Sequence, residues 1–161
     1  MTRAIIIGAP RSGSGKTSVT IGILRALARR GIKVRGAKSG PDYIDPGFHT
    51  AATGLSGVNL DSWAMSPDLL NALAGNATED ADFIFLESAM GLFDGIPAGQ
   101  GRTGSAADLA RLYHLPVLLV LDVSGQSRGG AARAQRVCLI HPAGAAGGEG
   151  VGAGGRAGRP P

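Results

Sequence analysis

A short apolar run that leads into a glycine-rich loop constrains the fold of this chain more than any other feature. Residues 4–8 read AIIIG, and from residue 8 the sequence continues GAPRSGSGKTS before a helical pattern begins. Glycines let a backbone wrap closely around a phosphate, and the N–H groups at the start of a helix point toward it. This order predicts a phosphate-binding loop, whose nucleotide-binding residues would be Ser12, Gly13, Ser14, Gly15, Lys16, Thr17 and Ser18.

Three side chains of this loop have distinct expected roles. Lys16 would reach the β- and γ-phosphates of a nucleotide, and the Thr17 hydroxyl would ligate Mg²⁺. The strict form of the motif has a glycine where this chain has Pro10, but the loop lies between a strand and a helix, as the mechanism requires. Arg11 has two open interpretations, a second phosphate contact or a solvated loop residue.

Apolar strand-like segments alternate with helical ones along the chain. Strands are predicted over 4–8, 33–38, 82–87 and 116–122, and helices over 16–31, 66–75 and 104–114. The first helix would bury Val19, Ile23, Leu24 and Leu27, and Ser66 and Ser105 would cap the other two. This alternation predicts a parallel α/β sheet with helices on both faces, which binds its ligand beyond the carboxyl ends of the strands.

Carboxylates follow the predicted strands at that edge. Glu87 ends the third strand beside the phosphate loop, where it would hold Mg²⁺ directly or through water. Asp94, between glycines, is either a turn residue or a group that faces a substrate. Asp122 would end the fourth strand, and a helix-capping role is favoured over assistance to Mg²⁺.

The run KSGPDYIDPGFHTAATG at residues 38–54 has no clean helix or strand period. Its Gly-Pro and Pro-Gly pairs fix the backbone, so we expect a stiff loop that carries Asp42, Tyr43 and Asp45. Lys38 would neutralise a phosphate or a substrate carboxylate. His49 is interpreted as a structural histidine, because the sequence offers it no visible partner.

Charge and composition divide the chain into a folded part over 1–132 and a tail over 133–161. Residues 1–130 hold 12 Lys and Arg against 11 Asp and Glu, so the folded part carries no electrostatic footprint for nucleic acid. Residues 141–161 contain eight glycines and no apolar period, which predicts disorder. We expect a cytoplasmic protein with no membrane span, and the single cysteine, Cys138, excludes an internal disulfide.

Four segments together resemble one known family. They are SGSGKT, KSGPDYIDPGFHTAATG, NLDSW at 59–63 and GLFDG at 91–95. This set is similar to the N-terminal ATP-binding (synthetase) domain of the cobyrinic and hydrogenobyrinic acid a,c-diamide synthases, from residue 4 to about 132. The resemblance implies a P-loop NTPase-like fold of the dethiobiotin synthetase and MinD type, incomplete at its C-terminal side.

The resemblance also implies a reaction. Such enzymes use ATP and Mg²⁺ to convert the a and c carboxylates of a corrin precursor into acyl phosphates, which ammonia released from glutamine then amidates in cobalamin biosynthesis. Thr17 and Glu87 would hold the metal. The residues that would position the ring carboxylates and ammonia are Lys38, Asp42, Tyr43, Asp45 and Asp94. The alternatives are a MinD/ParA-type nucleotide switch and amidation of another tetrapyrrole such as nickel-sirohydrochlorin.

This chain departs from the family pattern in two places. The family has Glu-Gly after its third strand, whereas this chain has Glu87-Ser88, whose side chain would crowd the loop. The family continues into a glutamine amidotransferase domain, whereas Gly/Ala/Arg/Pro composition begins here near residue 133. We expect a truncated chain with impaired glutamine-dependent activity, and we favour a frameshifted tail over a flexible linker. We also expect a homodimer.

Overall fold

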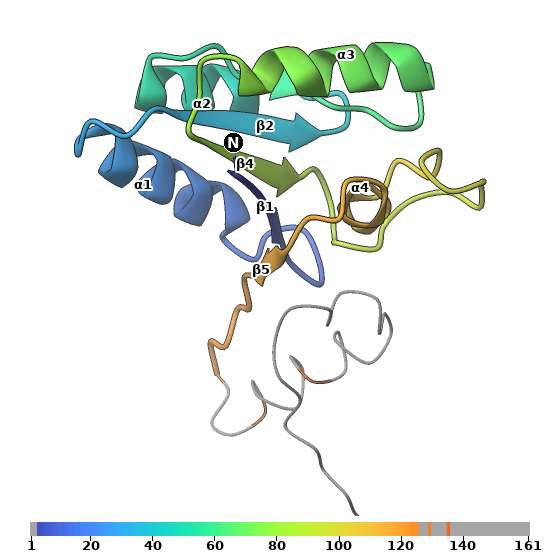
Figure 1. Ribbon diagram of the computed structural model, residues 1–161. Helices are drawn as coiled ribbons and strands as arrows, with labels where there is room; N and C mark the ends of the chain where they lie inside the picture. The colour runs from blue at the N-terminus through green and yellow to red at the C-terminus, as the bar shows by residue number, and fades with distance from the viewer. Residues whose placement is uncertain (1–2, 126–128, 130–134, 136–161) are drawn as a thin grey trace, which may run out of the picture.

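The computed structural model describes residues 3–125, 129 and 135, and it confirms the predicted parallel α/β sheet. Five parallel strands are hydrogen-bonded in the order β3-β2-β4-β1-β5, so β4 lies at the centre (Figure 1). The strands are β1 (Arg3–Gly8), β2 (Val34–Ser39), β3 (Val58–Asn59), β4 (Phe83–Ser88) and β5 (Val117–Leu119).

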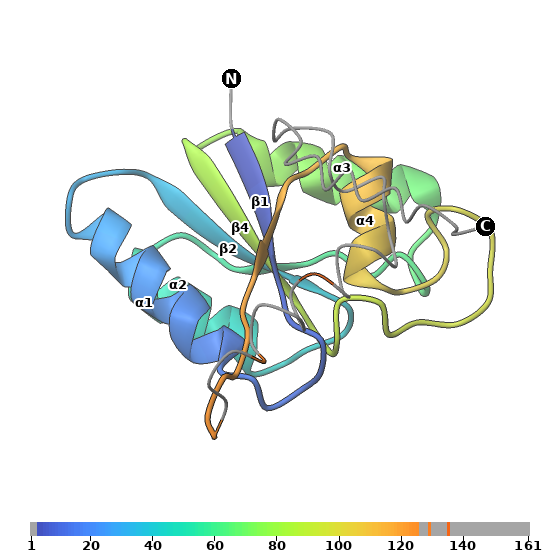
Figure 2. The same cartoon turned by 90° about the horizontal axis from the view of Figure 1, so that it is seen from below.

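In the part of the chain that the structure describes, four helices cover the two faces of this sheet. They are α1 (Lys16–Ala28), α2 (Asp45–Thr53), α3 (Pro67–Thr78) and α4 (Ala106–Leu112). Helices α1 and α2 pack together on one face, and α3 and α4 lie on the other (Figure 2). Among the described residues, no helix is long and apolar enough to cross a membrane.

Each face of the sheet has its own apolar core, because successive strand residues point in opposite directions. Ile6 packs into the core beneath α3 and α4, whereas the next residue, Ile7, packs beneath α1 and α2. Leu86 and Phe85 of β4 divide in the same way. Burying one such side chain contributes about 2 kcal/mol, so the central strands stabilise both layers.

The first helix ends three residues earlier than predicted, and its predicted buried face is confirmed at Ile23, Leu24 and Leu27 but not at Val19. The helix ends at Ala28, and Gly31 has a positive φ of 77° in the turn that follows. Its buried residues are Lys16, Thr20 and Leu24, whereas Val19 is exposed. The Thr20 hydroxyl donates to the Lys16 carbonyl at 2.9 Å, so a polar residue lies on the buried face without an unpaired hydroxyl.

The segment predicted as a stiff loop contains a helix instead. Asp42 Oδ1 accepts the backbone N–H groups of Ile44 at 2.8 Å and Asp45 at 3.0 Å, so this side chain anchors the start of α2. Pro46 fits the first turn of a helix because its nitrogen needs no hydrogen-bond partner there. The short strand β3 was also not predicted, since two residues carry no readable period.

The predictions for the other helices and strands are confirmed within a few residues, except for the last strand. The Ser66 and Ser105 side chains cap α3 and α4 by accepting from the N–H groups of Leu69 and Asp108. The strand predicted over 116–122 is only three residues long in β5, and Leu118 is partly exposed there. The predicted disordered tail falls outside the described residues, apart from residue 135.

Candidate functional site

The predicted phosphate loop has the geometry that phosphate binding requires. Gly13 and Gly15 adopt positive φ angles of 73° and 83°, which side-chain-bearing residues rarely adopt. No side chain caps the N-terminus of α1, so its first N–H groups have no side-chain acceptor from the cap. The Lys16 side chain folds back over the loop, and its Nζ lies 3.5 Å from the Arg11 carbonyl oxygen. Ser12 and Ser18 are exposed beside the loop.

Lys38 lies at the centre of a buried cluster of carboxylates at the end of β2. Its ammonium contacts Asp45, lies 3.0 Å from Glu87 Oε1 and lies 3.7 Å from Asp42 Oδ2. Lys38 is only 2% exposed and Glu87 is fully buried. Buried charges are tolerated where they are paired and hydrogen-bonded, and this cluster meets that condition.

The Thr17 hydroxyl joins the phosphate loop to this cluster. Thr17 Oγ1 donates to Glu87 Oε1 at 2.5 Å and lies 3.4 Å from Asp45 Oδ2. Three hard oxygen donors therefore converge at the start of α1, a donor set that suits Mg²⁺. No group of three His, Cys, Asp or Glu residues that could hold a metal occurs in the described part of the chain. A nucleotide-bound Mg²⁺ needs only one or two protein ligands, because phosphates and waters supply the rest.

The electrostatics of the cluster favour its charged forms. Burial alone would raise the pKa of Glu87, but hydrogen bonds from His49 and Thr17 and the charge of Lys38 outweigh burial and lower this pKa to about 2. Burial would lower the pKa of Lys38, yet hydrogen bonds to Asp45 and Glu87 raise it above its ordinary value. The pKa of Lys16 is lowered, chiefly by burial and against the pull of Glu87.

His49 is the member of this site that sequence reasoning missed. Its ring is fully buried, and its Nε2 lies 3.1 Å from Glu87 Oε2. Since the low pKa keeps Glu87 a carboxylate that only accepts, Nε2 is the donor. A Cβ at Gly36 of β2 would lie 2.5 Å from the His49 ring, so glycine makes room for this contact. The histidine was not visible as a partner because α2 was not predicted.

The remaining predicted residues differ in how close they lie to the Lys38 cluster. Asp42 contacts the cluster and also starts α2, and backbone N–H groups outweigh its burial to lower its pKa. Tyr43 is 97% exposed and lies outside the cluster. Asp94 Oδ2 accepts the Gly91 N–H at 2.8 Å, and its charge acts on Lys16, so it is both a turn residue and close to the phosphate loop.

Arg11 and Asp122 interact with each other, at an Nη2–Oδ2 distance of 3.2 Å. Asp122 lies beyond the end of β5 and also accepts the Ser124 N–H, while the helix that it was predicted to cap falls outside the described residues. Ser88 does not crowd its loop, because it is buried and its hydroxyl donates to the Met90 carbonyl at 2.9 Å.

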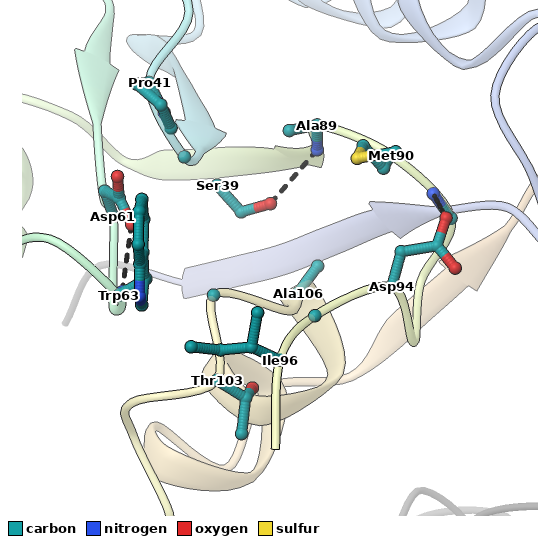
Figure 3. Close-up of a pocket in the computed structure, with 14 residues that line it drawn as sticks. Ser39, Pro41, Asp61, Trp63, Ala89, Met90, Asp94, Ile96, Thr103 and Ala106 are labelled. Carbon is teal, nitrogen blue, oxygen red and sulfur yellow. Dashed lines mark hydrogen bonds between the residues drawn. The ribbon is translucent and has the colours of Figure 1, made fainter. Parts of the chain in front are cut away.

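A cleft of about 430 Å³ opens beside the phosphate loop on the α3 and α4 face of the sheet. Figure 3 shows Trp63 and Asp61 on one wall and Met90 and Asp94 on the opposite wall. Ser39, at the end of β2, lies between them, and its hydroxyl accepts the Ala89 N–H at 3.1 Å. The cleft and the Lys38 cluster thus meet at the same edge of the sheet.

Comparison with known protein families shows which family contains this arrangement. The family described as the CobQ/CobB/MinD/ParA nucleotide binding domain matches residues 5–120. The chain belongs to this family. The match includes the phosphate loop, Lys38, Glu87 and the cleft, and it agrees with the parallel sheet described above. The resemblance noted in the sequence is thereby confirmed at the level of the nucleotide-binding domain.

Three curated relatives share the name hydrogenobyrinate a,c-diamide synthase. The chain is 81% identical over 140 residues to the protein from Mesorhizobium japonicum and 75% identical over 140 residues to that from Agrobacterium fabrum. It is 54% identical over 134 residues to that from Rhodobacter capsulatus. These matches cover 87%, 87% and 82% of this chain but 32%, 32% and 30% of the relatives, so the chain spans about a third of their length.

Solved structures support the fold alone. The signal recognition particle receptor FtsY from Elizabethkingia anophelis superposes with a TM-score of 0.62 at 16% identity, covering 88% of this chain and 48% of that one. Chloroplast FtsY from Physcomitrella patens gives a TM-score of 0.61 at 19% identity, covering 88% of this chain and 47% of that one.

Proposed function

We propose that this chain carries the ATP-binding part of an amidoligase that acts on hydrogenobyrinate. The observation that supports this most is the cluster of Lys38, Asp45 and Glu87 next to the phosphate loop. The curated relatives with 75–81% identity bear the name hydrogenobyrinate a,c-diamide synthase, and that name supplies the acceptor. ATP and Mg²⁺ are the cosubstrate and the metal of the proposal.

The residues have three roles in this reaction, which are to bind the phosphates, to hold the metal and to bind the incoming anion. Lys16 and the N–H groups at the start of α1 would bind the β- and γ-phosphates of ATP. Mg²⁺ bound by Thr17 and Glu87 would supply neutralisation of the charge on the transferring phosphoryl group. Lys38, now paired with carboxylates, would offer its ammonium to an incoming anion, and Asp42 and Asp45 would hold that ammonium in place.

The proposed chemistry has two balanced steps. An acetate carboxylate oxygen of the macrocycle attacks the γ-phosphorus, the bond to ADP breaks, and an acyl phosphate forms. Ammonia then attacks the acyl carbon, inorganic phosphate leaves, and the nitrogen loses a proton to give the amide. Phosphoryl transfer of this kind depends on positioning and charge neutralisation rather than on covalent catalysis by the protein.

The nitrogen source of the proposal is free ammonia in the first instance. The part of the chain that the structure describes contains no cysteine, and Cys138 lies outside it, so no thiol is assigned to glutamine hydrolysis here. We further propose that glutamine is the physiological donor of this ammonia and that this chain has reduced activity with glutamine. The proposal also includes a homodimer.

The test is ATP turnover by the whole chain with Mg²⁺, ammonium chloride and hydrogenobyrinic acid. We expect phosphate release that depends on the corrinoid, together with a mass increase of the amide product. The control variant Lys16→Ala should lose this turnover. Turnover that ignores the corrinoid and responds instead to a partner protein or to lipid vesicles would overturn the proposal in favour of a MinD/ParA-type switch.

A further inference from the structure

Trp63 is the one aromatic residue among the described residues that line the cleft. It is the single tryptophan of the sequence, and it is 58% exposed although burial of an indole would be favourable. Ile96 and Met90, which also line the cleft, are 47% and 58% exposed. The cleft therefore presents apolar surface that no described element covers.

The backbone around Trp63 is fixed from several directions. Asp61 is buried, and its Oδ1 accepts the N–H groups of Trp63 at 2.9 Å and Ala64 at 3.2 Å. The Arg102 guanidinium donates to the Trp63 carbonyl at 3.0 Å and to the Met65 carbonyl. A fixed backbone under an exposed ring lowers the entropic cost of placing a ligand on that ring.

Gly104 adds a further constraint on this side of the cleft. Its φ is 74°, and a Cβ there would lie 3.2 Å from the Trp63 Cβ. Its N–H donates to the hydroxyl of buried Ser62 at 3.1 Å. In Figure 3 the indole stands at one side of the cleft, across from Asp94 and Met90.

The opposite wall of the cleft leads to the phosphate loop. Gly91 packs so closely that a Cβ there would lie 2.8 Å from the Pro10 carbonyl oxygen. Leu92, on the same turn, donates its N–H to the Ala9 carbonyl at 2.7 Å. For a ligand on the indole, the phosphate loop would therefore lie beyond the opposite wall of the cleft.

We propose that Trp63 is a stacking platform for the conjugated ring system of the macrocyclic acceptor. This inference rests on the proposed function, and it makes Trp63 a substrate-binding residue of that same site. The cleft volume of about 430 Å³ lies toward the small end of the range for small-molecule sites. We therefore expect the cleft to take one edge of the ring with its acetate side chain rather than the whole macrocycle. Aromatic stacking supplies affinity with little demand on hydrogen-bond pattern.

The experiment measures binding of hydrogenobyrinic acid to the whole chain by equilibrium dialysis in every variant, and by tryptophan quenching in wild type and in the Phe48→Ala variant, which keep the single tryptophan. We expect Trp63→Ala to bind about tenfold more weakly and Trp63→Phe to bind within about threefold of wild type. The matched control is Phe48→Ala, since Phe48 is 53% exposed on α2, on the opposite face of the sheet. All three variants should bind ATP as wild type does.

The outcomes separate this inference from the proposed function. If wild type binds the corrinoid and Trp63→Ala binds it equally well, the stacking role is wrong and the proposed function stands. If wild type binds ATP but no corrinoid, both are wrong. Loss of binding in Phe48→Ala to the same degree as in Trp63→Ala would also overturn the assignment, because the effect would then not be specific to the cleft.

Discussion

His49 shows how one buried side chain positions another at the candidate metal site. Its Nε2–H holds Glu87 Oε2, while Thr17 and Lys38 contact Glu87 Oε1, so the carboxylate is fixed at both oxygens. Replacing a side chain that orients a metal ligand through a hydrogen bond typically lowers metal affinity by about 10–100-fold. We therefore treat His49 as a positioning residue rather than as a catalytic one.

The variant His49→Ala tests this role. We expect Mg²⁺-dependent ATP binding to weaken by about tenfold and the free energy of unfolding to fall by about 1–3 kcal/mol, because Glu87 loses a buried donor. Isothermal titration with and without Mg²⁺ measures the first effect, and urea unfolding measures the second. The control is His114→Asn, an exposed histidine with φ of 52° that asparagine tolerates. If affinity fell equally with and without Mg²⁺, the positioning role would be wrong.

Glu87 makes stability depend on pH in a defined window. Its pKa is about 2 in the folded chain against an ordinary value of 4.5, so its contribution is complete above about pH 4.5 and is lost as pH falls toward 2. At about 1.4 kcal/mol per pKa unit this contribution is a few kcal/mol. Urea midpoints of wild type should fall through this window.

Glu87→Gln should flatten that dependence, whereas Glu79→Gln should not, because Glu79 is exposed at the end of α3. These two are the glutamates of the described residues, so they form a matched pair. An equally steep loss of stability in Glu87→Gln between pH 4.5 and 2 would contradict the assignment of the low pKa to Glu87.

At the scale of elements, α2 and β2 depend on a contact between a glycine and a histidine ring. The ideal Cβ position at Gly36 lies 2.5 Å from two ring-proximal atoms of His49, Cβ and Cγ. Gly36→Ala should therefore push α2 away and cost about 1–3 kcal/mol of unfolding free energy. Gly22→Ala is the control, because nothing lies within 4 Å there and alanine favours a helix by about 0.5–1 kcal/mol. Thermal melts that rank both variants alike would contradict this account.

The elements also show what the sequence can and cannot predict. Strands β1, β2 and β4 were predicted because buried parallel strands are continuously apolar or end at polar residues of the site. Helix α2 was missed because Pro46 and Gly47 suggest a turn, whereas the Asp42 side chain starts a helix there. The Glu87–His49 contact could not be predicted, since it depends on the placement of that helix over Gly36.

The position of Val19 illustrates a second limit. Hydrophobic spacing places Val19 on the buried face of α1. In the structure, Thr20 and Leu24 are buried on this helix, whereas Val19 is exposed. Near the carboxyl edge of the sheet, the helix buries Lys16 of the phosphate loop and Thr20, whose hydroxyl donates to the Lys16 carbonyl. Apolar periodicity therefore fails where a functional site replaces the core.

At the scale of the whole molecule, β2 and β4 connect two regions on opposite faces of the sheet. Lys38 points into the carboxylate cluster beside α1 and α2, and the next residue, Ser39, points into the cleft beside Trp63. Glu87 and Ser88 alternate in the same way at the end of β4. Nucleotide and acceptor would thus approach the same edge from two sides, which is the arrangement that a phosphoryl transfer needs.

The most direct test of the central claim is the affinity of the whole chain for ATP with and without Mg²⁺, measured beside Lys16→Ala and Glu87→Gln. We expect Mg²⁺ to strengthen ATP binding to wild type, Lys16→Ala to lose binding in both conditions, and Glu87→Gln to bind ATP but to lose most of the Mg²⁺ effect. Wild type that does not bind ATP, or Glu87→Gln with an unchanged Mg²⁺ effect, would contradict this claim.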